Sequence, residues 1–126
     1  MSWLSALKSF HQALTEPPNW ETSLAYPDAY AVVRDILVSS YYGPNWWTLR
    51  TDDPEMGHLI GTLEFVEDYG QIQNLHRSMV LGVRLEDLGG KTRVIVDWDI
   101  NSPMGSHTCK KIKSYMMEWL RKRLPV

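Results

Sequence analysis

The apolar residues of this chain recur at two spacings, and each spacing predicts one kind of element. In residues 1–16 and again in residues 107–124 they recur every three or four positions, as on one face of a helix. Pro17 and Pro18 end the first of these helices. Its apolar face contains Trp3, Leu4, Leu7, Phe10, His11 and Leu14. The apolar face of the last helix contains Cys109, Ile112, Met116, Trp119, Leu120 and Arg123.

A third helix is predicted over residues 27–42, directly after a short strand. Residues 20–26 alternate between larger apolar or threonine side chains and smaller or polar ones, which is the period of a strand with one buried face. Pro27 then suits the first turn of a helix, and Gly43 suits its end. The buried face of this helix is predicted to contain Tyr30, Val33, Ile36 and Leu37.

From residue 46 the apolar period changes to two, and the pattern predicts two β-hairpins. The first turns at residues 54–57 and the second at residues 88–90. In the second hairpin we expect Glu86 to pair with Lys91, which brings apolar residues together on one face of the sheet. These are Met79, Leu81, Val83 and Leu85 opposite Trp98, Val96, Val94 and Thr92.

These elements predict one α+β domain over residues 1–126. Residues 1–16 form its amphipathic N-terminal helix, and residues 20–124 form a sheet-and-helix core. In that core a single antiparallel sheet of about five strands packs against the long C-terminal helix. The N-terminal helix has three alternative docking sites: its own sheet, a second copy of the chain, or a membrane surface.

The order strand, "YPDAYAVVRDIL", meander and long C-terminal helix resembles START/Bet v 1-like helix-grip domains over residues 20–124. The resemblance implies that the last helix packs across a curved sheet and that a hydrophobic small molecule binds between them. The side chains expected to line that pocket are Tyr30, Trp47, Trp98, Met116 and Trp119. A flatter, TBP-like two-layer sandwich is the alternative fold for the same order of elements.

Composition predicts a cytoplasmic protein. The chain has one cysteine, no secretory leader pattern and no apolar run of membrane-spanning length. Residues 1–106 carry a net charge of −7 and residues 107–126 a net charge of +5, which add to the total of −2. The basic segment suits either an anionic partner or the carboxyl end of a helix dipole. The overall acidity argues against specific nucleic-acid binding.

Motifs for cofactors and metals are absent from the sequence. "GGKT" at residues 89–92 lacks the earlier glycine of a phosphate-binding loop, because Leu85 stands at that position. The four histidines are scattered without the spacing of a zinc motif. We therefore expect neither a cofactor nor a metal.

Two carboxylates provide the best candidate for chemistry. Asp97 and Asp99 flank a tryptophan, so in a strand both point to one face, where Arg84 and Arg93 are also expected. Three interpretations remain: mutual charge pairing, a site for a polar ligand or partner, and an enzyme that uses Asp97 or Asp99 with Arg84 or Arg93.

The segment "YYGPNWW", residues 41–47, is the densest group of aromatic residues in the chain. Because neighbouring residues of a strand face opposite sides, Trp47 is predicted to lie in the core and Trp46 on the polar face with Arg50. Trp46 and Arg50 therefore join the candidate binding residues.

The leading functional hypothesis is a small non-enzymatic module that binds a protein partner or a modest apolar ligand, or that self-associates as a dimer. A helix-grip pocket for a hydrophobic small molecule is the second hypothesis, and an enzyme is the third.

Overall fold

The computed structural model describes residues 17–68, 74–101 and 106–126. Two helices form there, α2 (Tyr26–Ser39) and α3 (His107–Arg123). The strands are β1 (Asn19–Thr22), β2 (Tyr41–Tyr42), β3 (Asn45–Trp46), β4 (Thr48–Asp53), β5 (His58–Asp68), β6 (Asn74–Asp87) and β7 (Thr92–Asn101). The predicted helix at residues 1–16 lies outside the described residues.

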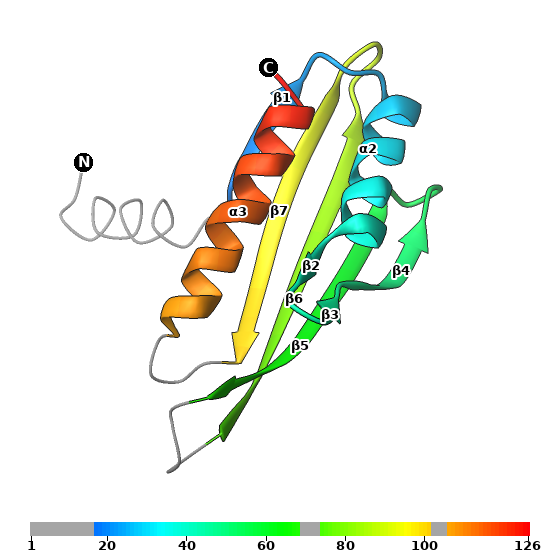
Figure 1. The fold of residues 1–126 in the computed structure, drawn as a ribbon. Coiled ribbons are helices and arrows are strands. Elements are labelled where there is room, and N and C mark those ends of the chain that lie inside the picture. Colours follow the sequence, from blue (N-terminus) through cyan, green and yellow to red (C-terminus); the bar gives the residue numbers. More distant parts are fainter. Residues whose placement is uncertain (1–16, 69–73, 102–105) are drawn as a thin grey trace, which may run out of the picture.

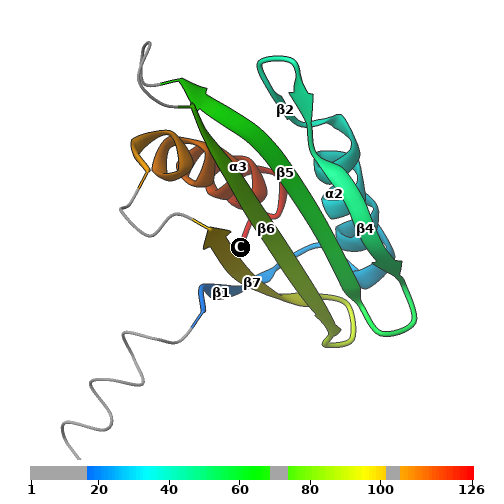
Figure 2. The same ribbon diagram turned by 90° about the horizontal axis from the view of Figure 1, so that it is seen from below.

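Five of the strands form one antiparallel sheet in the order β1-β7-β6-β5-β4. The remaining two, β2 and β3, form a small separate hairpin. Both helices lie across the same face of the large sheet, α3 along the β1–β7 side and α2 along the β4–β5 side (Figures 1 and 2). The predicted α+β class, with a helix-grip-like arrangement of sheet and C-terminal helix, is confirmed.

The core lies between the sheet and the two helices because β5, β6 and β7 direct alternate apolar side chains to that face. The residues that are fully enclosed there include Val33, Leu37, Leu59, Leu63, Met79, Leu81, Val94, Val96 and Leu120. The four buried residues predicted for the helix before Gly43 are all buried in α2.

Both ends of α3 are fixed to the sheet by buried hydrogen bonds. At its start the hydroxyl of Ser106 accepts a hydrogen bond from the backbone amide of Cys109 (3.1 Å) and contacts Glu67, which also pairs with Arg77 at 3.1 Å. At its end the indole of Trp20 donates to the carbonyl oxygen of Leu124 over 2.9 Å. These bonds hold α3 in a fixed position along the sheet.

The predicted register of the β6–β7 hairpin is wrong by two residues. Glu86 lies opposite Arg93, and not opposite Lys91. The carboxylate of Asp87 accepts a hydrogen bond from the amide of Gly89, which keeps Asp87 at the end of its strand. A shift of two residues returns each side chain to the same face, so the predicted core face is still correct.

The predicted end of the helix before Gly43 is also wrong. The helix ends at Ser39, and Ser40 has an extended backbone with φ −92° and ψ 146°. Tyr41 and Tyr42 therefore belong to β2, and the chain reverses at Gly43, whose φ of 58° favours glycine.

Candidate functional site

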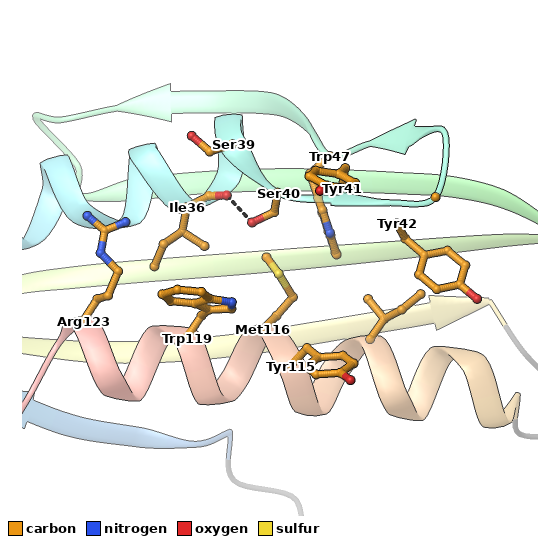
Figure 3. A pocket seen from close by; sticks show the side chains of 12 residues that line it. Ile36, Ser39, Ser40, Tyr41, Tyr42, Trp47, Tyr115, Met116, Trp119 and Arg123 are labelled. Carbon is orange, nitrogen blue, oxygen red and sulfur yellow. Dashed lines mark hydrogen bonds between the residues drawn. The ribbon is translucent and has the colours of Figure 1, made fainter.

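An open cavity of about 520 Å³ lies between the carboxyl end of α2, the β2–β3 hairpin and α3. Figure 3 shows side chains from α3 rising toward those of α2 and the hairpin. The lining residues are Ile36, Ser39, Ser40, Tyr41, Tyr42, Gly43, Trp47, Ile112, Tyr115, Met116, Trp119 and Arg123. This volume lies in the range of small-molecule sites in proteins, about 300–1,000 Å³.

The end of α2 determines one wall of the cavity. The hydroxyl of Ser40 donates to the carbonyl oxygen of Ile36 (2.6 Å), and the carbonyl of Ser40 accepts from the amide of Trp47 (3.0 Å). These bonds close the chain into a compact unit in which the hairpin follows the helix directly. As a result Trp47 is brought back beneath the end of α2.

Five of the twelve described lining residues of the cavity are aromatic. Trp47 is 4% exposed and packs edge-on against Trp98, with ring centroids 6.1 Å apart. Tyr115 and Trp119 on α3 are about half exposed, as is Tyr41 on the hairpin, so these three rings stand at the open side. The cavity therefore has a buried indole at its base and exposed rings at its mouth.

The indole N–H of Trp47 has no hydrogen-bond partner among the residues that the structure describes. In that part of the chain every fully buried side-chain nitrogen or oxygen has a partner, so this N–H is not fully enclosed by protein, and Trp47 lines the cavity. Figure 3 shows the indole nitrogen of Trp47 on the side that faces Met116 and α3. The cavity thus contains a hydrogen-bond donor in a mostly apolar wall.

Arg123 provides the charged group of the cavity lining, and a carboxylate next to the cavity pairs with it. Its guanidinium lies 2.6 Å from Asp35 on α2. The hydrogen bond from Arg123 is the main cause that lowers the pKa of Asp35, which therefore stays ionised at neutral pH. The positive charge at this end of the cavity is thereby balanced by a negative one.

Three of the five predicted lining residues border the cavity: Trp47, Met116 and Trp119. Tyr30 lies elsewhere, because its hydroxyl donates to Asp52 of β4 at 2.5 Å. Trp98 stands behind Trp47, and its indole donates to the sulfur of Met117 at 3.4 Å. Trp119 was expected in the buried stripe of α3, but it is 49% exposed because it stands at the cavity mouth.

Sequence reasoning missed Tyr41, Tyr42, Tyr115 and Arg123 as lining residues. The first two were assigned to the end of a helix, although Gly43-Pro44-Asn45 between aromatic pairs also suits a tight hairpin. Tyr115 lies one residue before Met116 and was left off the apolar face of α3. Its position next to Trp119 along the helix was the available signal.

Trp46 and Arg50, predicted to share one face, belong to different sheets. Trp46 is in β3, is 58% exposed and packs on Tyr41, with ring centroids 4.9 Å apart. Arg50 stands at a register shift of β4 and donates from Nε to Thr62 at 3.0 Å. Because Tyr41 lines the cavity, Trp46 lies next to the cavity mouth.

The charged residues predicted to lie together on the other face of the sheet do not form one group. They are Arg84, Arg93, Asp97 and Asp99. Arg93 pairs with Glu21 at 3.3 Å and with Glu86 at 3.9 Å, whereas Arg84 lies opposite Ile95 in the sheet. Arg84 and Asp97 border a second, smaller cavity of about 320 Å³.

That second cavity lies over Gly82, a residue without a side chain, and His58, Ile60 and Ile95 also border it. Within the described ranges, no ion pair joins Arg84, Asp97 or Asp99 to another residue, and Asp99 does not line this cavity. The role of these residues stays a prediction.

Among residues 17–68, 74–101 and 106–126, no group of three or more His, Cys, Asp or Glu side chains is placed to hold a metal ion. Neither described helix combines the length and the apolar character that crossing a bilayer requires.

No family model matches the chain, and no curated protein matches it by sequence. A START superfamily protein from Mycobacterium smegmatis matches in structure, with 15% identity, a TM-score of 0.39, and coverage of 85% of this chain and 91% of that one.

Two further matches are aromatase/cyclases. The di-domain ARO/CYC StfQ from the steffimycin biosynthetic pathway has 12% identity and a TM-score of 0.46 over 87% of this chain, which spans 43% of that protein. The Zhui aromatase/cyclase from a Streptomyces species has 12% identity and a TM-score of 0.35, covering 84% of this chain and 82% of its own. The predicted layout-level resemblance to START-like domains is confirmed, and it concerns the arrangement of elements alone.

The sheet order, the two helices on one face and the cavity between them define the class of this protein. It is a helix-grip-like α+β domain with an aromatic cavity under the end of α2.

Proposed function

We propose that this domain binds a small, flat, apolar molecule in the aromatic cavity and does not catalyse its conversion. One observation carries the proposal: a cavity of about 520 Å³ has walls formed by Trp47, Tyr41, Tyr42, Tyr115 and Trp119. Flat rings stack on or pack edge-on against such side chains, and each contact removes apolar surface from water.

The exposure of the rings supports a ligand rather than simple core packing. Tyr41, Tyr115 and Trp119 are 63%, 57% and 49% exposed. About half of each of these side chains is exposed to water around the same cavity, whereas Trp47 is buried. Contiguous exposed apolar groups of this kind mark sites of ligand or partner contact. A ligand that fills the hollow would bury the inner side of each ring.

Binding without chemistry is supported by what the lining contains. Among its described residues there is no histidine, carboxylate, cysteine or lysine. The hydroxyl of the lining residue Ser39 donates to Asp35 at 3.3 Å, but the hydrogen bond from Arg123 lowers the pKa of Asp35 and makes this carboxylate a weak base. The hydroxyl of Ser40 already donates to the carbonyl oxygen of Ile36. The cavity therefore offers apolar surface and hydrogen-bonding hydroxyls, without a histidine or carboxylate in its lining to act as a general base.

The test is equilibrium dialysis of the full chain against a panel of neutral two- and three-ring aromatic compounds. We expect saturable binding at one site, with each compound recovered unchanged by mass spectrometry. Ser39→Trp places a large ring at the cavity margin and should weaken binding at least tenfold. Ser114→Trp places the same ring on the exposed side of α3, away from the cavity, and should leave binding unchanged.

Two results would contradict the proposal. One is the absence of saturable binding for the whole panel up to the solubility limit of each compound. The other is equal binding by the wild type and by Ser39→Trp, which would place the ligand elsewhere on the molecule.

A further inference from the structure

The donor at the base of the cavity narrows the chemistry of the ligand. Trp47 is the most buried ring of the cavity lining, and its N–H faces the cavity without a partner among the described residues. Water can reach this N–H while the cavity is empty. When an apolar ligand fills the cavity, that water is displaced.

Once this water is displaced, the ligand determines whether the indole N–H keeps a hydrogen bond. If the ligand has no acceptor, the donor loses its hydrogen bond, and an unsatisfied buried donor is costly. If the ligand carries an oxygen at that point, the bond to water is exchanged for one in a drier and less polar setting. A site built this way rejects the analogue that lacks the acceptor.

The charges around the cavity determine whether the acceptor can be ionised. Arg123 is the cationic side chain of the lining, and Asp35 already neutralises it at 2.6 Å. A carboxylate ligand would lose its hydration on entering the cavity, and it would find Arg123 already paired with Asp35. A neutral acceptor such as a carbonyl oxygen avoids that cost.

We propose that the ligand is a neutral ring compound with a carbonyl oxygen, and that this oxygen accepts a hydrogen bond from Nε1–H of Trp47. This inference rests on the proposed function, because it names the chemistry of the molecule held in the same cavity. Trp119 supplies a comparison: its N–H also has no partner in the described chain, but the residue is half exposed and water remains available to it.

The experiment uses two compounds that differ in one group. 2-Acetylnaphthalene carries C=O where 2-isopropenylnaphthalene carries C=CH₂, and the two have nearly the same shape. Their dissociation constants are measured by equilibrium dialysis with the wild type, Trp47→Phe and Trp119→Phe. 2-Naphthoic acid, which is ionised at neutral pH, is the charged member of the series.

The ratio of the two dissociation constants is compared across the variants, so that the different solubilities of the two compounds cancel. We expect the ketone-to-alkene preference of the wild type to fall about threefold to tenfold in Trp47→Phe, the value of one net hydrogen bond. The preference should be unchanged in Trp119→Phe, and the acid should bind more weakly than the ketone. In wild-type protein labelled with ¹⁵N, the ketone should move the indole proton resonance of Trp47 downfield, whereas the alkene should not.

The NMR measurement decides the question even if Trp47→Phe fails to fold. Binding of both compounds with an unchanged preference, no selective shift of the Trp47 resonance, or an acid as tight as the ketone would overturn this inference while leaving the proposed function intact. Failure of both neutral compounds to bind would instead count against the proposed function itself.

Discussion

Gly61 on β5 lies directly beneath Leu37 of α2, and replacing it with alanine should destabilise the protein. A Cβ at this position would lie 2.6 Å from Cδ2 of Leu37 and 3.4 Å from Cε3 of Trp47. Carbon atoms normally pack at about 3.5–4.0 Å, so the leucine methyl would have to retreat by about 1 Å. Leu37 is 0% exposed, so its side chain cannot move out into solvent.

The expected cost is about 1–3 kcal/mol, the usual effect of one extra methyl group in a packed core. For a domain of this length each kcal/mol lowers the Tm by about 4 °C, so Gly61→Ala should melt about 4–12 °C below the wild type. The pressure on Trp47 also moves the base of the aromatic cavity. We therefore expect weaker ligand binding together with lower stability.

Gly82 on the neighbouring strand is the matched control. It faces the other side of the sheet, where a Cβ would meet only the carbonyl oxygen of Asp97 at 3.8 Å. Alanine there should be neutral or stabilising by up to about 1 kcal/mol, since glycine in a strand carries an entropic cost. The assay is urea unfolding followed by circular dichroism, with the Tm as second readout. Equal stability of Gly61→Ala and the wild type would show that the α2–sheet packing described here is wrong.

Two further predictions concern pH and the N-terminal segment. Burial, followed by the hydrogen bond to Asp52, raises the pKa of Tyr30, so the unfolded chain ionises this tyrosine before the folded one does. The stability that the neutral phenol contributes is fully present below about pH 10 and is lost as the pH rises further. In urea unfolding, the free energy of unfolding of Tyr30→Phe should therefore fall less at alkaline pH than that of the wild type. An equal fall in both proteins would refute this cause. Deleting residues 1–16 should lower the Tm if their apolar face docks on this chain, and an unchanged Tm would favour docking elsewhere.

The fold was largely predictable because its determinants are local periodicities. The apolar period of two from residue 46 and the helical period after residue 106 produced the meander and the last helix. The register of β6–β7 was not predictable from the pattern, since a shift of two residues preserves both faces. The turn selects the observed pairing: the side chain of Asp87 accepts from the amide of Gly89, and the amide of Leu88 donates to the carbonyl oxygen of Lys91.

The cavity was predictable only in part, because its lining comes from segments far apart in the sequence. Trp47, Met116 and Trp119 were expected from their apolar character and their faces. The hairpin residues Tyr41 and Tyr42 were not, because a helix that stops three residues earlier has the same amphipathic pattern up to its end. The hydrogen bonds of Ser40 with Ile36 and Trp47 determine where that helix stops, and they depend on the returning chain.

The difference in length between helix and strand explains why a small domain contains a cavity at all. The 14 residues of α2 rise by about 21 Å, whereas the 11 residues of β5 extend over about 36 Å. Since α2 covers one end of the strands, about 15 Å of strand at the other end would remain open on that side. The hairpin covers this gap through Tyr42, whose ring meets Phe65 of β5 at 5.4 Å. A two-residue strand cannot fill the space as a full helical turn would, so the aromatic cavity remains between the hairpin and α3.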